Sequence, residues 1–551
     1  MNTTIALFLL GAGFYIVRTI LRRCFSPLAN IPGPPSKSLI AGEHNLYHEL
    51  ARNLKEFHAP DDWEFQHSLE RDYQQVVKIT GILNDHQLFV FDPAALSSIL
   101  VQAQDVFDEQ PMLMCLAHLL FGRGILTTVG EEHRRFRKIM TPAFSTTNLR
   151  ELVPLFFEVA QKARDGLIAP NLVNGPKTLD MNSVSCRISL ELIGRAGIGY
   201  SFDPMIHDKD QTNEFGTALR ALFLTAFKMQ LWFPLLPSLM KIFSPSFLQL
   251  MVDIVPWPAL HEVRELVTLT GTTAAKLVKI RKAAIESGEF AVDDKGKDMI
   301  SVLVKSNLSA ESGMHLTDDE LVSCTSLVNS LLMILFAATD TASASVNRIF
   351  HLLATHPDIQ EKLRAEILAG PENPNHDELV ALPYLDSFVR ETLRLYPPAS
   401  PVVYREARND AVLPLSTPII GVDGNTIESI PVPKGTSIYI AIAAANHNKR
   451  IWGEDALEFK PERCINGKAE GVSTKFCGVY GNTMTFVGGA HSCIGFKFAQ
   501  LEMKVVTYVA LRAFRFSAPD PQIIWRKGGV VPAPSVDNKP LLPMLVEKIT
   551  Q

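Results

Sequence analysis

The sequence contains few cysteines, and they form no recognisable pattern. Seven occur among 551 residues, no two are spaced as Cys-x-x-Cys, and their count is odd. Their positions are 24, 115, 186, 324, 464, 477 and 493. The cysteines therefore form neither a disulfide framework nor a zinc site, and most of the chain is expected to face a reducing compartment.

The sequence also lacks the charge, repeats and linkers that are typical of several other classes of protein. The net charge of −5 is small for this length and argues against nucleic acid as a partner. The interior has no Ser/Gly-rich linker, no low-complexity tract, no repeat of fixed period and no nicotinamide or flavin fingerprint. Because 47% of the residues are hydrophobic, the chain can bury a large core.

One long apolar run lies at the N-terminus. Residues 5–17 are apolar or small, Arg18 follows them, and Arg22-Arg23 come after residue 21. The span 5–21 is at the short end for a transmembrane helix, with Arg18 able to reach the membrane surface. A cleaved signal peptide is the alternative, but it requires basic residues before the run. Their position after it predicts an anchor whose following domain stays cytoplasmic.

The remaining chain is expected to form one domain of mainly α structure with a smaller β part. We assign 1–24 to the anchor, 25–36 to a proline-rich hinge whose segment 31–35 cannot be helical, and 37–551 to the domain. Helices are predicted over 317–354, 386–395 and 496–514, the first opened by the capping box at 317–320. Strands are predicted over 76–91 (two), 399–406, 419–431 (a hairpin), 437–443 and 541–546.

The stretch 486–495, Phe-Val-Gly-Gly-Ala-His-Ser-Cys-Ile-Gly, presents one cysteine on a loop that enters a helix. Gly489 and Gly495 permit backbone angles and close approaches that a side chain would block. The free N–H groups and positive dipole end of the helix favour sulfur in its anionic form. The loop therefore suits a thiolate ligand, as in one kind of haem enzyme. The alternative is an inert buried cysteine in a turn.

Two polar pairs lie on the predicted helices. Asp340 and Thr341 stand among Leu, Phe, Met and Ala, so they need hydrogen-bond partners, and Thr341 can bond back to its own helix and open a notch. Glu391 and Arg394 are three residues apart and face the same way. Taken alone, this second pair predicts an exposed ion pair worth under about 1 kcal/mol.

A basic helix begins near residue 131. His133 and Arg137 are four residues apart and share one face of it. The other cations, Arg134, Arg135 and Lys138, are interpreted as a solvated face that is able to dock a redox partner.

The order and spacing of these motifs resemble the cytochromes P-450, the haem-thiolate monooxygenases, in their microsomal form. Five residues match the haem-binding loop of the family: Phe486, Gly489, His491, Cys493 and Gly495. His491 stands where Arg is usual. The resemblance starts at the proline-rich hinge and runs nearly to the C-terminus. It implies the fold of that family, with haem b as the cofactor.

The resemblance also implies a role for each motif. Cys493 is expected to be the axial ligand of the haem iron. His491, Arg137, Arg405 and His133, the last standing where Trp is usual, are expected to bind the haem propionates. Asp340 and Thr341 are expected to relay protons, with Ala338 in the place of the usual Gly narrowing the notch. A structural triad is expected to lock the core behind the haem: Glu391, Arg394 and Arg463.

The implied reaction is activation of O₂ and insertion of one oxygen atom into an apolar substrate. Electrons are expected from a membrane-bound NADPH–cytochrome P-450 reductase, with cytochrome b5 as a further candidate and Lys497 and Lys504 on the docking face. One alternative is an isomerase or dehydratase that needs no external electrons, which the intact Asp340-Thr341 pair disfavours. Another is a non-catalytic haem or lipid binder on the membrane. The expected location is the endoplasmic reticulum membrane, with the catalytic domain facing the cytoplasm.

The substrate is expected to be hydrophobic: terpenoid, sterol-like or aromatic. Apolar residues available to face it are Phe107, Met112, Leu113, Phe336 and Val402. The stretches HRRFRKIMTPAF and WGEDALEFKPER resemble fungal members, which often serve secondary metabolism. A further apolar region, 215–257, contains the segment Leu-Trp-Phe-Pro-Leu-Leu-Pro. It is interpreted either as a loop that dips into the bilayer or as a buried helix pair.

Overall fold

The computed structural model describes residues 26–35, 62–81, 85–206, 213–287, 297–308, 324–399, 403–467, 476–518, 523–528 and 531–549. The predicted anchor and the capping box at 317–320 lie outside these residues, as does Val402. Among the described helices, none is by itself long and apolar enough to cross a membrane. The expectation of one domain over 37–551 stays a prediction.

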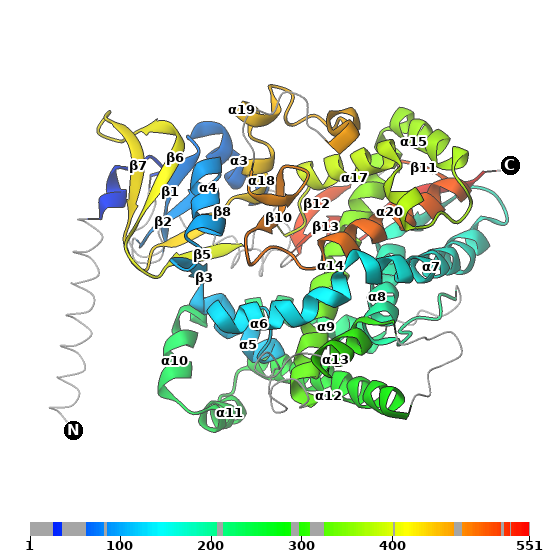
Figure 1. The fold of residues 1–551 in the computed structure, drawn as a ribbon, viewed down its shortest axis with the longest axis horizontal. Coiled ribbons are helices and arrows are strands. Elements are labelled where there is room, and N and C mark those ends of the chain that lie inside the picture. Colours follow the sequence, from blue (N-terminus) through cyan, green and yellow to red (C-terminus); the bar gives the residue numbers. More distant parts are fainter. Residues whose placement is uncertain are drawn as a thin grey trace. The chain divides into compact units, whose positions relative to one another are not determined.

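The chain forms two compact units, each assembled from segments that are distant in sequence. The first comprises Met1–Gln110, Ser400–Gly453 and Ser473–His491, and the second comprises Pro111–Ala399, Glu454–Val472 and Ser492–Gln551. Figure 1 labels their elements along the chain.

The first unit is built on a five-stranded sheet. The strand order is β1–β2–β8–β5–β3, in which β2 and β8 are parallel and the other neighbours are antiparallel. The bounds are β1 Val76–Gly81, β2 Asp85–Val90, β3 Phe107–Glu109, β5 Tyr404–Ala407 and β8 Ser437–Ile440. The two strands predicted over 76–91 are confirmed. The strand predicted over 437–443 ends early, because alanine-rich α18 (Ile442–Asn446) begins there.

Short helices and two hairpins complete the first unit. Strands β6 (Ala411–Ile420) and β7 (Thr426–Val432) form the predicted hairpin, and Gly424 in its turn has a φ of 82°. Residues 31–35 are not helical, as predicted, and the Pro32 carbonyl accepts a hydrogen bond from the Lys78 N–H of β1 at 2.9 Å. The other elements are η1 Pro27–Asn30, α3 Asp62–Asp72, α4 Pro93–Ser97, η3 Ser98–Gln102, α19 Lys449–Trp452, β9 Gly478–Tyr480 and β10 Thr483–Gly488.

The second unit is organised around one long helix, α14 (Cys324–Thr355). With 32 residues it is about 48 Å long. It contacts α8 (Met181–Ile198), α12 (Pro258–Ser287), α17 (Pro383–Leu395) and α20 (Phe496–Ala513). Because α14 is packed on several sides, polar residues in its middle are held in a largely apolar environment. Its end at Thr355 agrees with the prediction.

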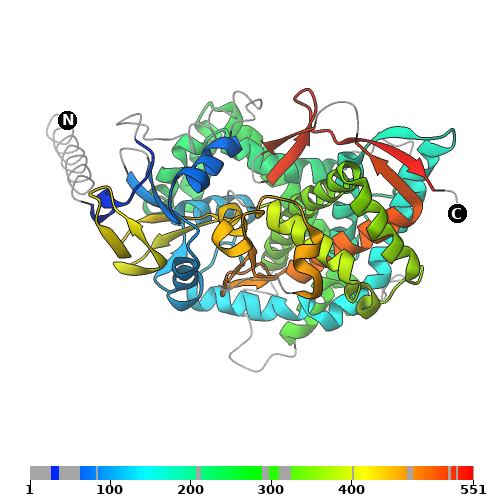
Figure 2. The same ribbon diagram turned by 90° about the horizontal axis from the view of Figure 1, so that it is seen from above.

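The remaining helices of the second unit surround this group. Their bounds are α5 Pro111–Phe121, α6 Gly130–Met140, η4 Thr141–Phe144, α7 Thr146–Ala163, η5 Arg164–Ile168, η6 Ala169–Leu172, α13 Met299–Leu308, α15 Pro357–Ala369, α16 His376–Val380 and η10 Pro461–Gly467. Strand β4 (Lys177–Asp180) pairs with β14 (Pro543–Lys548), which also pairs with β11 (Phe514–Ser517). This small sheet lies near the C-terminus in Figure 2. Strands β12 (Ile524–Gly528) and β13 (Val531–Ser535) form a separate hairpin.

The apolar region 215–257 forms α9 (Glu214–Phe227), η7 (Gln230–Leu235), α10 (Leu236–Ile242) and α11 (Pro245–Ile254). Helices α10 and α11 contain no buried residue. Their exposed large apolar side chains are Leu239, Ile242, Phe243, Phe247, Leu250, Met251 and Ile254. Helices α10 and α11 are therefore not the buried pair of the second interpretation, whereas α9 at the start of the region is largely buried.

Candidate active site

Cys493 lies on the loop between β10 and α20. Its side chain is exposed, and Gly495, two residues later, is the N-cap of α20. Desolvation by the surrounding protein raises the pKa of the thiol, while a hydrogen bond from the Gly495 N–H and the charge of Arg137 act in the opposite direction. The helix terminus and a cation thus favour the thiolate as predicted, but desolvation outweighs them. A metal ion that bound the sulfur would deprotonate it.

The two glycines of the loop differ in what they do. Gly489 has a φ of 72°, and a Cβ there would lie 1.7 Å from the carbonyl oxygen of Leu100, so the predicted need for glycine is confirmed. Gly495 has a φ of −86°, and a Cβ there would meet only Phe144 at 3.7 Å and the Cys493 sulfur at 4.0 Å. The prediction that Gly495 is required by its backbone angles or by close approach of the protein chain is therefore wrong. Phe486, which precedes them, packs edge-on against Tyr480.

Arg137 of α6 is fixed next to the cysteine. Its guanidinium donates to the Ser492 carbonyl oxygen at 2.6 Å and to the Ser492 hydroxyl at 2.9 Å. Desolvation lowers the pKa of Arg137, and the charge of Cys493 opposes this. His133, one turn earlier on α6, is buried. Two residues that are far apart in sequence, Arg137 and Cys493, are therefore brought together as predicted.

His491 and Arg405 lie in the first unit, where both face one carboxylate. Arg405 pairs with Glu109 of β3 at 2.8 Å, and the His491 Nδ1 lies 3.5 Å from the same Glu109 oxygen. Desolvation raises the pKa of Glu109, with the Arg405 charge lowering it and Asp108 raising it again. The sequence analysis missed Glu109. The sequence offered one sign of its position: Glu109 is followed by Gln110-Pro111, and a proline marks the end of a strand.

Asp340 and Thr341 lie in the middle of α14. The Thr341 hydroxyl donates to the Ala337 carbonyl at 2.7 Å, which is the predicted bond to its own helix. Desolvation raises the pKa of Asp340 to about 6, although the charge of Arg220 lowers it. No described residue hydrogen-bonds to the Asp340 carboxylate. A carboxyl group that titrates near neutral pH is able both to take up and to release a proton.

Aromatic side chains cluster on the same stretch of α14. Phe336 stacks on Phe223 of α9 with ring centroids 4.6 Å apart, and Phe121 of α5 lies 4.9 Å from Phe336. Phe227 extends the cluster, 5.9 Å from Phe223. Phe336 was a predicted pocket residue, whereas the other three were not singled out. Through Phe336, one helical turn before Asp340, they form an apolar surface on this part of α14.

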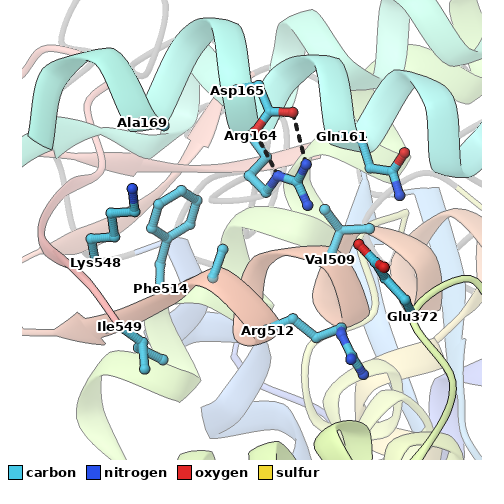
Figure 3. A pocket seen from close by; sticks show the side chains of 11 residues that line it. Gln161, Arg164, Asp165, Ala169, Glu372, Val509, Arg512, Phe514, Lys548 and Ile549 are labelled. Atoms are coloured by element: carbon cyan, nitrogen blue, oxygen red, sulfur yellow. Dashed lines mark hydrogen bonds and ion pairs between the residues drawn. The ribbon is translucent and has the colours of Figure 1, made fainter. Parts of the chain in front are cut away.

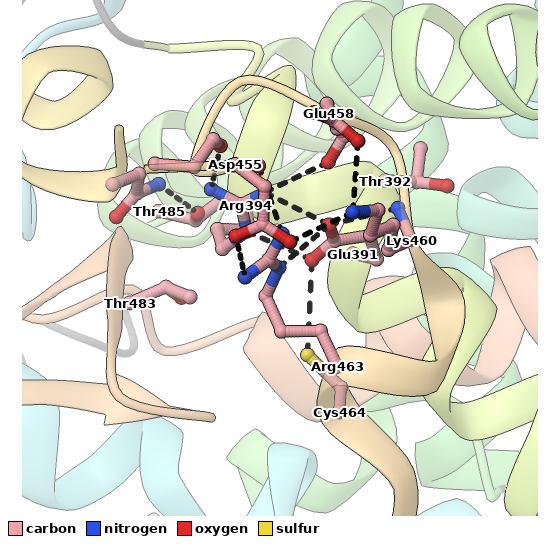
Figure 4. A network of polar contacts seen from close by, with 12 residues as sticks. Glu391, Thr392, Arg394, Asp455, Glu458, Lys460, Arg463, Cys464, Thr483 and Thr485 are labelled. Carbon is pink, nitrogen blue, oxygen red and sulfur yellow. Dashed lines mark hydrogen bonds and ion pairs between the residues drawn. The ribbon is translucent and has the colours of Figure 1, made fainter. Parts of the chain in front are cut away.

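Glu391, Arg394 and Arg463 form a buried network (Figure 4). Both Glu391 oxygens accept from Arg394 at 2.8 Å, and one also accepts from Arg463 at 3.3 Å and from the Lys460 N–H at 3.1 Å. The side chains of Glu391 and Arg394 have no exposed area. Arg463 in turn donates to the side chain of Asp455 at 2.9 Å. The three residues of the predicted triad are thus joined as the resemblance implied, and not as an exposed pair.

A cleft of about 550 Å³ lies elsewhere on the second unit, between the ends of α7 and α20 and strand β14 (Figure 3). Both of its arginines are already partnered: Arg164 pairs with Asp165, and Arg512 donates to the Ile367 carbonyl. Arg512 is near the C-terminal end of α20, so it is separated by most of this helix, about 27 Å, from Cys493 at the other end. The cleft is therefore not part of the cysteine site.

The prediction that Lys504 lies on the docking face is wrong. Lys504 is buried on α20, and its ammonium group pairs with Asp386 at 2.7 Å, so it is not available to a partner. Lys497 is exposed, as are Arg134, Arg135 and Lys138 of α6. Lys497 and Lys504 are seven residues apart, about two helical turns, so both were expected on the same exposed face. This spacing does not indicate that Lys504 pairs with a carboxylate inside the core.

The family model for cytochrome P450 matches residues 48–536. The chain belongs to the cytochrome P450 family. Members of this family bind haem b through a cysteine thiolate. P450 proteins are oxidoreductases, and this chain is therefore one as well.

Three relatives share almost the whole length of this P450. Cytochrome P450 monooxygenase 91 of Postia placenta is 41% identical over 97% of each chain. The ganoderic acid synthetase of Ganoderma lucidum is 34% identical, over 100% of this chain and 99% of its own. A P450 monooxygenase of Hericium erinaceus is 32% identical, over 95% and 94%.

The described residues fit a haem. The donor set consists of one accessible thiol, Cys493, on a loop whose Gly489 leaves no room for a side chain. Arg137, in the same unit as Cys493, is locked beside it through Ser492. A single sulfur donor next to a fixed cation matches a metal complex that carries acidic side chains.

Proposed function

We propose that this P450 is a haem-thiolate monooxygenase that hydroxylates or epoxidises a hydrophobic small molecule with electrons from an NADPH-dependent reductase. The observation that carries the proposal is Asp340, whose pKa is raised to about 6 on the helix where the family places its proton relay. An isomerase or dehydratase has less need of such a group, because it does not reduce O₂ and takes up no protons for that step. We therefore rank oxygen chemistry first.

Cys493 is proposed as the axial ligand of haem b. Arg137, Arg405, His491 and His133 are proposed to hold the propionates, and Phe486, Gly489 and Gly495 to shape the loop. Haem bound through a thiolate supplies reductive O₂ activation, because the thiolate donates electron density that favours O–O cleavage. Arg137 contributes by fixing the Ser492 main chain, and hence the position of the cysteine loop.

Asp340 and Thr341 are proposed to deliver the protons of the reaction. A carboxyl group with a pKa near 6 is populated in both protonation states at physiological pH, which suits proton transfer. The Thr341 hydroxyl, held by the Ala337 carbonyl, presents its oxygen as an acceptor for a donated proton.

The substrate is proposed to be a terpenoid, sterol-like or aromatic compound. The cluster of Phe336, Phe223, Phe121 and Phe227 offers flat apolar surfaces to such a molecule. A relative named ganoderic acid synthetase supports oxidation of a fungal secondary metabolite as the physiological reaction.

The proposed electron donor is a membrane-bound NADPH–cytochrome P-450 reductase, with cytochrome b5 as a second donor. The proposed docking face consists of four exposed cations, Arg134, Arg135 and Lys138 of α6 and Lys497 of α20. Electrostatic attraction between such a basic face and an acidic partner speeds association and is weakened by salt. The proposed location is the endoplasmic reticulum membrane, reached through the anchor at 5–21.

The reaction is tested with the purified full-length protein, the reductase, NADPH and ¹⁸O₂, offered a panel of terpenoids, sterols and aromatic compounds. A monooxygenase yields a product with one ¹⁸O atom, and only when NADPH and reductase are both present. Conversion without NADPH would instead support the isomerase or dehydratase. Haem binding with neither conversion nor NADPH consumption across the panel would support the non-catalytic binder.

Helices α10 and α11 are proposed to contact the bilayer, so that apolar substrates enter from lipid. Their apolar side chains include Ile242 and Ile254, which are 72% and 64% exposed. A chain lacking residues 1–30 should float with liposomes, and replacing both isoleucines by glutamate should release it. Full solubility without liposome binding before any replacement would refute the contact.

A further inference from the structure

Three side chains of metal-binding type meet in the first unit, on elements that the proposed reaction does not use. His67 and Glu70 lie on α3, one turn apart, and His447 caps the C-terminal end of α18. One imidazole nitrogen from each histidine and one carboxylate oxygen lie within 4.8 Å of one another. Sequence analysis could not find this group, because 376 positions separate Glu70 from His447.

The distances are close to those of a metal centre. The Nδ1 atoms of His67 and His447 each lie 3.5 Å from an oxygen of Glu70. In a tetrahedral site with ligand bonds of about 2.0–2.2 Å, neighbouring ligand atoms are about 3.3–3.5 Å apart. The two imidazole rings are nearly parallel, at 16°, with centroids 6.0 Å apart. The two nitrogens face different oxygens of Glu70, Oε2 and Oε1, so small side-chain movements have to bring the three ligand atoms, which lie within 4.8 Å of one another, to tetrahedral spacing.

We propose that His67, Glu70 and His447 bind a divalent transition-metal ion of the Zn²⁺ type. Two imidazole nitrogens and one carboxylate are a ligand set that suits zinc, whereas Ca²⁺ and Mg²⁺ require mainly oxygen ligands. With three protein ligands, the fourth position is open to water. This ion is distinct from the haem iron, whose ligand is a thiolate.

Burial and charge are compatible with this role. The side chain of His67 is 47% exposed, that of Glu70 17% and that of His447 6%, so the ion can enter from the His67 side and be held deeper in the protein. The carboxylate of Glu70 faces both imidazoles, so it supplies negative charge for a divalent cation at this site.

The site would fasten α3 to the end of α18. Helix α3 is close to β1 in sequence, and α18 follows β8 directly. A bound ion therefore adds a link between an early and a late segment of the first unit, and it stabilises the folded state by an amount that rises with the logarithm of the free ion concentration above Kd.

The test uses full-length haem-loaded protein purified without a polyhistidine tag and stripped of loose metal with EDTA. Zinc is titrated by calorimetry, and bound zinc is then measured relative to iron by mass spectrometry, so that the haem provides an internal count of folded protein. Variants His67→Ala and Glu70→Gln are compared with His376→Ala. The last is a matched control, because His376 pairs with a single carboxylate, Asp377.

The proposal predicts one zinc site per haem in the parent and in His376→Ala. It predicts at least an about tenfold weaker affinity in His67→Ala and Glu70→Gln, with the haem spectrum unchanged. Magnesium should not compete. Absence of saturable zinc binding in the parent, or equal affinity in all four proteins, would overturn the site and leave a metal-free ion-pair cluster.

Discussion

Glu391 and Asp340 are both acidic residues on helices of the second unit, yet their surroundings are opposite. Glu391 on α17 is fully buried, and its two oxygens accept hydrogen bonds from two arginines and a backbone N–H. Asp340 on α14 has no hydrogen bond to its carboxylate from any described residue, and its pKa is raised to about 6. The comparison separates two uses of a carboxyl group in one protein.

A fully paired carboxylate is fixed in one protonation state and one position, so it can only hold structure together. A carboxyl group that is desolvated and weakly paired changes its protonation easily, so it can take part in a reaction. Substitutions of Glu391, Glu502 and Asp340 test this difference between a paired and an unpaired carboxyl group, and the largest effect is expected at Glu391.

Replacing Glu391 by alanine should prevent stable haem incorporation. The change leaves Arg394 and Arg463 without their shared anion, and removing one partner of a buried network costs about 3–5 kcal/mol. The measurement is haem absorbance per mole of purified protein. The matched control is Glu361→Ala, which breaks an exposed pair with Arg515 and one hydrogen bond from Arg364, whose guanidinium keeps its bonds to Gln360, Leu511 and Phe514. A Glu391→Ala protein with full haem content would contradict the structural role.

Glu502 is an intermediate case. It is buried on α20, where one oxygen accepts from the Ser189 hydroxyl at 2.6 Å and the other has no partner among the described residues. Burial raises its pKa to about 7, with the Ser189 hydrogen bond opposing this. Between about pH 4.5 and 7 the folded state therefore holds a proton that the unfolded state has lost, and the free energy of unfolding falls as pH rises.

Glu502→Gln should remove this loss of stability. At pH 8 the variant should be more stable than the parent by up to about 3 kcal/mol, and near pH 4.5 the two should be equal. Thermal melts at both pH values measure the difference. A parent whose melting temperature falls no more than that of the variant between pH 4.5 and 8 would argue against a protonated Glu502.

Asp340→Asn should slow the reaction without changing the haem site. The amide keeps the shape of the carboxyl group but carries no exchangeable acid proton, so product formation should fall about 100-fold. In the parent, the rate should show an inflection near pH 6, and in the variant this inflection should vanish. Unchanged haem content is the control for folding. A variant with the parental rate and pH profile would place the proton relay elsewhere.

Much of the site was predictable because its residues are set by local motifs. The cysteine loop, the Thr341 bond to its own helix and the Glu-x-x-Arg pair each occupy a few neighbouring positions, so periodicity and spacing reveal them. The same holds for the hairpin turn at Gly424 and for the end of α14. Arg137 was placed correctly by resemblance, although its contact with Ser492 spans 355 residues.

The features that were missed depend on distant packing. Burial of Lys504 follows from its pairing with Asp386, 118 residues away, which no sequence pattern indicates. Glu109 became a partner of Arg405 and His491 through strand pairing of β3 with β5. At Gly495 the composition suggested a backbone constraint, whereas the φ of −86° is open to any residue.

The most direct test is the carbon-monoxide difference spectrum of the dithionite-reduced protein. Parent and Cys477→Ala should both show a strongly red-shifted Soret band, and Cys493→Ala should not, because only Cys493 supplies the thiolate. An unshifted band in the parent would mean ligation by a neutral thiol or a histidine. A shifted band that persists in Cys493→Ala would equally contradict the assignment of this cysteine as the iron ligand.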